Sequence, residues 1–438
     1  MIRDRERATE DPAVTVALDC IEAGIERARP ETVVPAVVAR DGQTITVAGE
    51  QFDRRAYDEL VVLGGGNAAG HVAAALEREL GAALDGGVVV TDSPVDLDRV
   101  RVLPADHPLP SERGVESTRE LLAAADDCGE RTLVIAVVTG GGSACLAAPD
   151  GVSLADLRST TRTLLDGGVP IESVNAVRKH LSAVKGGQLA RRLAPARVCG
   201  LVLSDVVGDD LSVIASGPLT PDPSTFRDAL DVVDGVDGAV PDSVRRRLTR
   251  GVEGAVPETP DAGDPVFDQV TTHVVANNMT ALRAASERAA EAGYEPLILS
   301  SRVRGEARTA AGTHAAIAAE IRATGTPVEP PAVVLSGGET TVTVSGDGQG
   351  GPNQEFVLGG LADLPADSVL AAVDTDGIDG ATDAAGAVVD GGNRPGEAAV
   401  RDALDRSDAY GLLADHDALV ETGPTGTNVN DLRVVVVR

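Results

Sequence analysis

The chain has 438 residues, with 68 Asp and Glu against 38 Lys and Arg, so its formal net charge is −30 at pH 7. This length predicts two domains or three, and the 43% apolar fraction is enough for a packed core, which excludes a disordered acidic protein. The negative charge would repel nucleic-acid phosphates, and no run of about 18 apolar residues occurs, so we expect neither a nucleic-acid partner nor a membrane span.

The cysteines and the overall composition indicate where in the cell the protein works. Four scattered cysteines form no CxxC pair and the first residues contain no apolar secretory segment, so we expect a reducing, cytoplasmic location. The acidic, lysine-poor composition is typical of a halophilic cell, where salt screens self-repulsion; a GC-rich genome would give a similar bias.

The chain's two lysines, Lys179 and Lys185, lie within seven positions, which indicates a need for a compact ammonium group there.

Apolar strands alternate with helices along most of the chain. Near-continuous Val, Ile and Leu runs that open through glycine turns into helices are typical of parallel strands covered on both faces. The sequence therefore predicts an α/β protein with a Rossmann-like, three-layer N-terminal domain, whose sheet is mostly parallel, and a second α/β domain. A helix is expected over 12–29, and the clearest strands within 59–66, 86–92, 131–139, 197–210, 332–346, 368–380 and 432–438.

A change in composition marks the expected domain boundary. From 231 to 268 the chain is rich in Asp, Gly, Pro and Val, interrupted by one short basic helix, VRRRLTR. We therefore expect an N-terminal domain over 1–262 and a C-terminal domain over 263–438.

Two glycine turns follow predicted strands. GGGNAAG (64–70) could hold a phosphate on its backbone amides, and it loosely matches the dinucleotide fingerprint, with Asp92 ending the next strand. A purely structural tight turn explains it equally well. GGGSACL (140–146) has the same design, with Ser143 at a helix start. The common phosphate loop, GxxxxGK[ST], does not occur.

Acidic residues follow other strands. Asp205, Asp209 and Asp210 come after the strand near 200, and carboxylates at a strand end suit Mg²⁺, although solvated acidic loop residues are the alternative. DTDGIDGATDAAGA (374–387) resembles an EF-hand loop in spacing but lacks the Glu at position twelve, so calcium binding is rejected.

Eight segments, in this order, resemble the glycerate 2-kinase family, the class II glycerate kinases with a C-terminal MOFRL domain. The resemblance covers nearly the whole chain. It implies ATP- and Mg²⁺-dependent phosphorylation of the 2-hydroxyl of D-glycerate in a cleft between two α/β domains, with the MOFRL region at about 331–433, small-molecule partners and a homodimer as one option. The segments are DHPLP, TGGGSACL, NAVRKHLSAVKGG, LSDVVGDDLSVIASGPLTPDPSTF, SGGETTVTV, GGPNQE, DTDGIDGATDAAGA and TGPTGTNVNDL.

Phosphoryl transfer depends mainly on positioning and on positive charge around the transferred group. We expect catalytic roles for Arg178, Lys185, Asp205 and Asp209, the two aspartates also being the ligands of Mg²⁺; which cation does which task stays open. Glycerate is expected at His107, Lys179 and Ser216. ATP is expected at Gly65, Gly66, Asn67, Gly141, Gly142, Ser143, Gly337, Gly338, Glu339 and Asn353.

Two positions depart from the family pattern. Asn67 stands where the family usually has lysine, and Pro352 where it has arginine. A rearranged site, a related sugar acid as substrate, and ligand binding without turnover are all compatible with these departures. A hypothesis from another class is an NAD(P)-dependent hydroxypyruvate reductase, which rests on the first glycine turn and Asp92.

Overall fold

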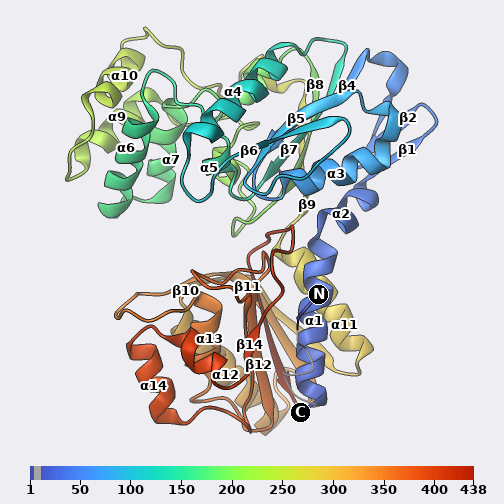
Figure 1. The fold of residues 1–438 in the computed structure, drawn as a ribbon, viewed down its shortest axis with the longest axis vertical. Helices are drawn as coiled ribbons and strands as arrows, with labels where there is room; N and C mark the ends of the chain where they lie inside the picture. The colour runs from blue at the N-terminus through green and yellow to red at the C-terminus, as the bar shows by residue number, and fades with distance from the viewer. Residues whose placement is uncertain (4–10) are drawn as a thin grey trace. The chain divides into compact units, whose positions relative to one another are not determined.

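The structure is a computed structural model that describes residues 1–3 and 11–438. Its chain divides into two compact units (Figure 1). The first, Val33–Val275, is here called the Rossmann unit, and the second, Met1–Thr32 with Ala276–Arg438, the C-terminal unit. Within the described residues, no helix has the length and apolar character needed to cross a bilayer.

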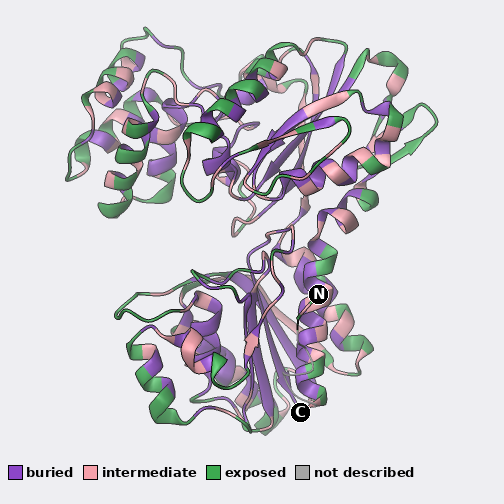
Figure 2. Ribbon diagram, in the orientation of Figure 1, coloured by how far each residue is buried: buried purple, intermediate pink, exposed green. Residues whose placement is uncertain are grey.

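The Rossmann unit is built on a six-stranded sheet in the order β6-β5-β4-β7-β8-β9. Parallel ladders join β4 to β5 and β7, β5 to β6, and β7 to β8. All eight residues of β7 are buried, so both faces of the sheet are covered (Figure 2), which confirms the predicted Rossmann-like domain. The strands are β4 Glu59–Gly65, β5 Gly86–Thr91, β6 Val100–Pro104, β7 Thr132–Thr139, β8 Arg197–Leu203 and β9 Val270–Ala276.

Helices and a small sheet complete this unit. The helices are α2 Pro30–Val37, α3 Ala69–Leu80, α4 Glu112–Asp126, α5 Gly142–Cys145, α6 Leu154–Asp166, α7 Ile171–His180, α8 Gln188–Leu193, α9 Phe226–Gly235 and α10 Asp242–Val252. A separate antiparallel sheet contains β1 Val38–Asp41, β2 Thr44–Val47 and β3 Glu50–Asp53.

The expected boundary within 231–268 is wrong. This stretch belongs to the Rossmann unit, where α9 and α10 bury Phe226, Val233, Val244 and Leu248 in a core shared with α6 and α7. A few apolar residues at helical spacing are enough to form this subdomain, although the surrounding composition is that of a linker.

The C-terminal unit has a mixed six-stranded sheet in the order β10-β11-β15-β12-β13-β14. The β10–β11 ladder is parallel and the others are antiparallel. Helices α12 to α15 share one apolar core with the sheet, and α1 and α11 share another. The elements are α1 Pro12–Ala28, α11 Asn278–Glu291, α12 Ala307–Thr324, α13 Pro352–Gly360, α14 Glu397–Asp405, α15 Ala409–Ala414, β10 Glu295–Glu306, β11 Ala332–Thr341, β12 Ser368–Asp374, β13 Gly386–Asp390, β14 Leu419–Val420 and β15 Asp431–Val437.

Helix α1 corrects the expected assignment of 1–262 to one domain. The carboxylate of Asp11 accepts from the amide of Ala13 and starts the helix. The buried face of α1, which includes Leu18 and Ile21, then packs with α11 and the second sheet. The N-terminal helix thus belongs to the C-terminal unit, and β9 extends the Rossmann unit to Val275.

Candidate active site

Three of the predicted segments meet at the carboxyl ends of β4, β7 and β8. The amide of Asn67, after β4, donates to the carbonyl oxygen of Gly140, after β7, over 2.8 Å. A Cβ on Gly140 would lie 2.2 Å from Oδ2 of Asp205, after β8, so glycine is required for the carboxylate to rest against this turn. The strand order reverses between β4 and β7, and ligands of open α/β sheets bind at such a point.

The first glycine turn is packed tightly and its amides are used within the protein. A Cβ on Gly66 would lie 2.3 Å from Oγ1 of Thr139, and Gly65 is packed almost as closely. The Asn67 amide donates to the second glycine turn, and the Ala68 amide donates to the Thr139 hydroxyl over 3.2 Å. The amides that would hold a phosphate here already have acceptors, so the tight-turn interpretation describes this segment better than a phosphate cradle.

The second glycine turn is packed as closely as the first, but it differs in its backbone hydrogen bonds. Gly141 has φ +71°, and a Cβ there would lie 1.8 Å from Oδ1 of Asn67. In the part of the chain that the structure describes, the amides of Gly142 and Ser143 donate no hydrogen bond. The hydroxyl of Ser143 lies 2.8 Å from that of Ser216. This turn therefore offers unused backbone donors beside two hydroxyl groups.

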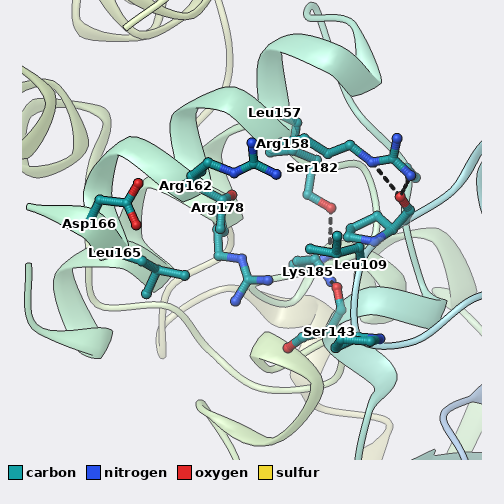
Figure 3. A pocket seen from close by; sticks show the side chains of 15 residues that line it. Leu109, Ser143, Leu157, Arg158, Arg162, Leu165, Asp166, Arg178, Ser182 and Lys185 are labelled. Atoms are coloured by element: carbon teal, nitrogen blue, oxygen red, sulfur yellow. Dashed lines mark hydrogen bonds between the residues drawn. The ribbon is translucent and has the colours of Figure 1, made fainter. Parts of the chain in front are cut away.

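A cavity of about 340 Å³ lies beside the second glycine turn (Figure 3). Arg158 and Arg162 line it from α6, Arg178 from α7, and Lys185 from the loop that follows α7. Four cations around one cavity, in a protein of net charge −30, create a local field that attracts an anion. Its other lining residues are Pro108, Leu109, Pro110, Ser143, Ala147, Ala148, Leu157, Thr161, Leu165, Asp166 and Ser182.

Lys185 and Arg178 are the least exposed of the four cavity cations. Lys185 is 3% exposed, and its Nζ donates to the carbonyl oxygens of Ser143 over 2.7 Å and of Leu146 over 3.0 Å. Burial, and then the charge of Arg178, lower the pKa of Lys185 well below its usual value, and burial also lowers the pKa of Arg178. Among the described residues neither cation has a carboxylate partner. A buried and a half-buried cation side by side without a counter-ion favour the binding of an anion between them.

Lys179 has a different environment. Its Nζ lies 3.2 Å from Oδ1 of Asp222, both side chains are buried, and Asp222 also accepts from the hydroxyl of Thr259. This pair neutralises the ammonium group within the fold, and the cavity lining does not include Lys179, so the structure adds no support to the expectation that Lys179 binds substrate. His107 is exposed, and the cavity lining includes Pro108 and Leu109 but not His107. His107 is therefore not part of the cavity lining, and the structure adds no support to its expected role in substrate binding.

Asp205 and Asp209 are the predicted metal ligands. Both are half-buried in the loop after β8, and Asp209 adopts φ +59°. The space left by the missing Cβ of Gly140 lets the Asp205 carboxylate lie against the second turn. Mg²⁺ is commonly held by one or two carboxylates together with phosphate oxygens, so this pair fits the ion in charge and in donor type.

The remaining predicted residues lie in the C-terminal unit, on β11 and α13. Gly337 packs against Asn278, whose Oδ1 would lie 1.8 Å from an added Cβ, and Gly338 has φ +125°. Glu339 follows on the same strand, and burial, with a smaller effect of Asp431, raises its pKa. These glycines are required for close packing within this unit.

Asn353, at the start of α13, joins a cluster of buried carboxyl groups. Its Nδ2 donates to Asp431 over 2.7 Å and to Asp379 over 3.2 Å. Asp374 lies opposite Asp431 on the neighbouring strand. Burial is the main cause that raises the pKa of all three carboxyls, that of Asp379 to about 7. Arg433 forms an ion pair with Asp431 inside this cluster.

Arg158 and Arg162 are the two cavity cations that the sequence did not predict. They stand four positions apart on one helix, a spacing that places two side chains on the same face. That spacing, in a chain where acidic residues outnumber basic ones, was the sequence feature that could have indicated an anion site. It did not single out these residues because surface arginines at this spacing are common.

The fold, together with the site at the carboxyl ends of β4, β7 and β8, defines a doubly wound α/β protein of the Rossmann-like class. Its cation-lined cavity lies near the point where the strand order reverses. A model of a domain of unknown function, DUF4147, matches residues 16–249, and the MOFRL family matches 332–431. The chain is 38% identical to a glycerate 2-kinase from Pyrococcus horikoshii, over 96% of this chain and 97% of that protein.

Two further relatives bear on the family. A protein from Agrobacterium vitis, provisionally named hydroxypyruvate reductase, is 40% identical over 92% of this chain and 93% of its own length. The crystal structure of a glycerate kinase from Thermotoga maritima superposes with a TM-score of 0.84 at 36% identity, covering 97% of this chain and 99% of the other. The chain belongs to the glycerate 2-kinase family.

Proposed function

We propose that this protein transfers the γ-phosphoryl group of ATP to the 2-hydroxyl of D-glycerate and forms 2-phosphoglycerate. The observation that carries the proposal is the half-buried Arg178 and the buried Lys185, which line one cavity beside the second glycine turn. A glycerate carboxylate and a transferred phosphoryl group are the kinds of anion that such a pair stabilises. The Pyrococcus relative is named a glycerate 2-kinase and the Thermotoga structure a glycerate kinase, which supports phosphorylation of glycerate by this chain.

The hydrogen bonds of the two cations suggest a division of tasks. The Arg178 guanidinium makes no hydrogen bond or ion pair within the described residues, so its planar fork is open to a carboxylate, which it would bind through two parallel hydrogen bonds. Lys185 uses two of its three donors on main-chain carbonyls and keeps one near the second turn. We therefore assign the glycerate carboxylate to Arg178 and the phosphoryl group to Lys185.

The phosphates of ATP would lie at the second turn, on the amides of Gly142 and Ser143, with the ion held by Asp205 and Asp209. When bound there, Mg²⁺ neutralises charge on the phosphate oxygens. In this assignment the cavity arginines supply the positive charge around the substrates. Pro352 occupies the first turn of α13, where no backbone donor is needed.

The direct test is a product assay on the purified full chain in molar KCl, since dilute buffer would leave the acidic surface unscreened. Glycerate and ATP are incubated with Mg²⁺, quenched and diluted, and enolase is added alone. Enolase converts 2-phosphoglycerate but not 3-phosphoglycerate, so phosphoenolpyruvate reports the position of transfer. Absence of ADP and of phosphoenolpyruvate, with longer sugar acids also inactive, would contradict the proposal.

Asp205→Asn tests the assigned metal ligand. Loss of one carboxylate weakens Mg²⁺ binding, so the concentration of Mg²⁺ that gives half-maximal rate should rise about tenfold or more, as for the loss of one charge-assisted contact. An Mg²⁺ dependence equal to that of the parent protein would remove Asp205 from the ion site.

The reductase alternative gains no support from the first turn, because the Asn67 and Ala68 amides are engaged within the protein rather than open to a pyrophosphate. A parallel incubation with hydroxypyruvate and NADH or NADPH measures this alternative. Oxidation of the cofactor without phosphorylation of glycerate would favour the reductase.

A further inference from the structure

A second group of chemically reactive side chains lies in the Rossmann unit, away from the carboxyl ends of the strands. Glu50 begins β3, Cys199 lies in the first half of β8, and His273 lies on β9, the edge strand. A carboxylate oxygen, the Cys199 sulfur and an imidazole nitrogen all lie within 4.8 Å of one another. Asp205 follows the opposite end of β8, so this group is distinct from the candidate active site.

We infer that Glu50, Cys199 and His273 form a binding site for a thiophilic divalent metal ion of the Zn²⁺ type. Thiolate, imidazole and carboxylate are the ligands that Zn²⁺ takes in proteins. A tetrahedral ion would separate the three ligand atoms by roughly 3.3–3.6 Å. The His273 Nε2 to Glu50 Oε1 distance is 2.8 Å, so small side-chain adjustments would admit the ion.

The surroundings of Glu50 suit a metal-bound carboxylate. Arg197 lies 2.5 Å from Oε2 of Glu50 and also donates to the hydroxyl of Thr271, while Oε1 faces His273. One carboxylate oxygen is thus fixed by hydrogen bonding and the other is directed toward the ligand group, as is common in the outer shell of metal sites. Arg197 is itself held 5.8 Å from the centre of the Phe52 ring.

Access and protonation are compatible with metal entry. The side chains of Glu50 and His273 are 28% and 32% exposed, so solvent reaches the group and could supply a fourth ligand. Binding releases the thiol proton of Cys199 and places the imidazole proton on Nδ1.

A bound ion would link the two sheets of the Rossmann unit. Glu50 belongs to the small sheet of β1, β2 and β3, whereas Cys199 and His273 belong to two strands of the large sheet. The Glu50–His273 hydrogen bond and the Glu50–Arg197 ion pair already join the small sheet to β9 and β8, and a metal ion would add a second link to β8 through Cys199. Since the ion binds the folded arrangement, it should raise the melting temperature.

The test uses the full chain, stripped of metal with a chelator and titrated with Co²⁺ in molar KCl, which suppresses loose binding to the acidic surface. We expect one equivalent to bind with micromolar or tighter affinity, with a thiolate-to-cobalt absorption band in the near ultraviolet. Zn²⁺ should displace the Co²⁺ and raise the melting temperature. Absence of stoichiometric binding would overturn the inference.

Two variants identify the ligands. Cys199→Ser should abolish the thiolate band, while Cys128→Ser, at a half-buried thiol in the same unit, should leave it unchanged. His273→Gln changes a partly exposed side chain, so it is expected to fold, and it should weaken Co²⁺ binding at least about tenfold, as for loss of one ligand. A band that persists in Cys199→Ser, or unchanged affinity in His273→Gln, would show that the ion binds elsewhere.

Discussion

The ammonium group of Lys185 lies 2.7 Å from the carbonyl oxygen of Ser143. Through this hydrogen bond Lys185 contacts the second glycine turn. The same side chain lines the cavity together with Arg178. Lys179, six positions earlier, points into a buried ion pair with Asp222 instead. The two lysines of the chain therefore have different tasks, one at the cavity and one within the fold.

Lys185→Met should lower kcat by at least about 100-fold, comparable to the loss of one strong transition-state donor, because the substitution keeps the volume but removes the charge. Steady-state kinetics with glycerate and ATP measure this change. The matched control is the double variant Lys179→Met, Asp222→Asn, which removes a buried pair together and leaves the cavity cations in place. Near-normal turnover in Lys185→Met would exclude this lysine from the reaction.

Gly140→Ala should lower kcat about 100-fold, because the added Cβ would lie 2.2 Å from Oδ2 of Asp205 and push the carboxylate from the turn. The backbone of Gly140 is outside the left-handed region, so the substitution itself causes no backbone strain. Gly129→Ala, where an added Cβ meets no atom within 4 Å, is the control. Equal activity of the two variants would contradict a role for the position of Asp205.

Arg162→Gln should raise the KM for glycerate about tenfold with a smaller effect on kcat, since an exposed charge at the cavity contributes mainly to anion capture. The KM for ATP should change less. Arg119→Gln, on an exposed position of α4, makes the same change in net charge outside the cavity. If both variants shift the KM equally, the effect reflects the overall charge of the protein and not the cavity.

The carboxyl cluster of the C-terminal unit predicts a pH dependence of stability. Burial raises the pKa of Asp379 to about 7, whereas the unfolded chain loses this proton near its ordinary value of 3.8. Between these two values the folded state binds the extra proton, so the free energy of unfolding falls as the pH rises from about 4 to about 7. The loss is on the order of 4 kcal/mol at most.

Thermal melts of the parent protein and of Asp379→Asn across this pH range measure the effect. The variant cannot ionise at this position, so its melting temperature should fall less between about pH 4 and pH 7. It keeps one side-chain oxygen, which can replace only one of the two carboxylate oxygens that now accept from the amides of Asn353 and Gln354, so both proteins are compared by their slopes with pH and not by their absolute stabilities. Identical slopes for the two proteins would show that Asp379 does not carry the pH dependence.

The sequence identified the strands and turns of the Rossmann unit because their signals are local. A continuous apolar run such as that of β7 can be buried on both faces, and the glycines after it permit the close approach of Gly140 to Asp205. The same local reasoning predicted α1 almost to the residue. It could not assign α1 to the C-terminal unit, since the partner of an apolar helix face is not encoded within that helix.

The sequence by itself determined the family, the alternation of strands and helices, and the set of polar segments that follow the strands, because each depends on residues close together in the chain. Only the tertiary structure decided which polar side chains share a space. It paired Lys179 with Asp222, gave Arg178 and Lys185 no carboxylate partner among residues 1–3 and 11–438, and added Arg158 and Arg162 to the cavity. Whether a buried charge is neutralised or open to a ligand depends on neighbours brought close by folding, and these stand far apart in the sequence.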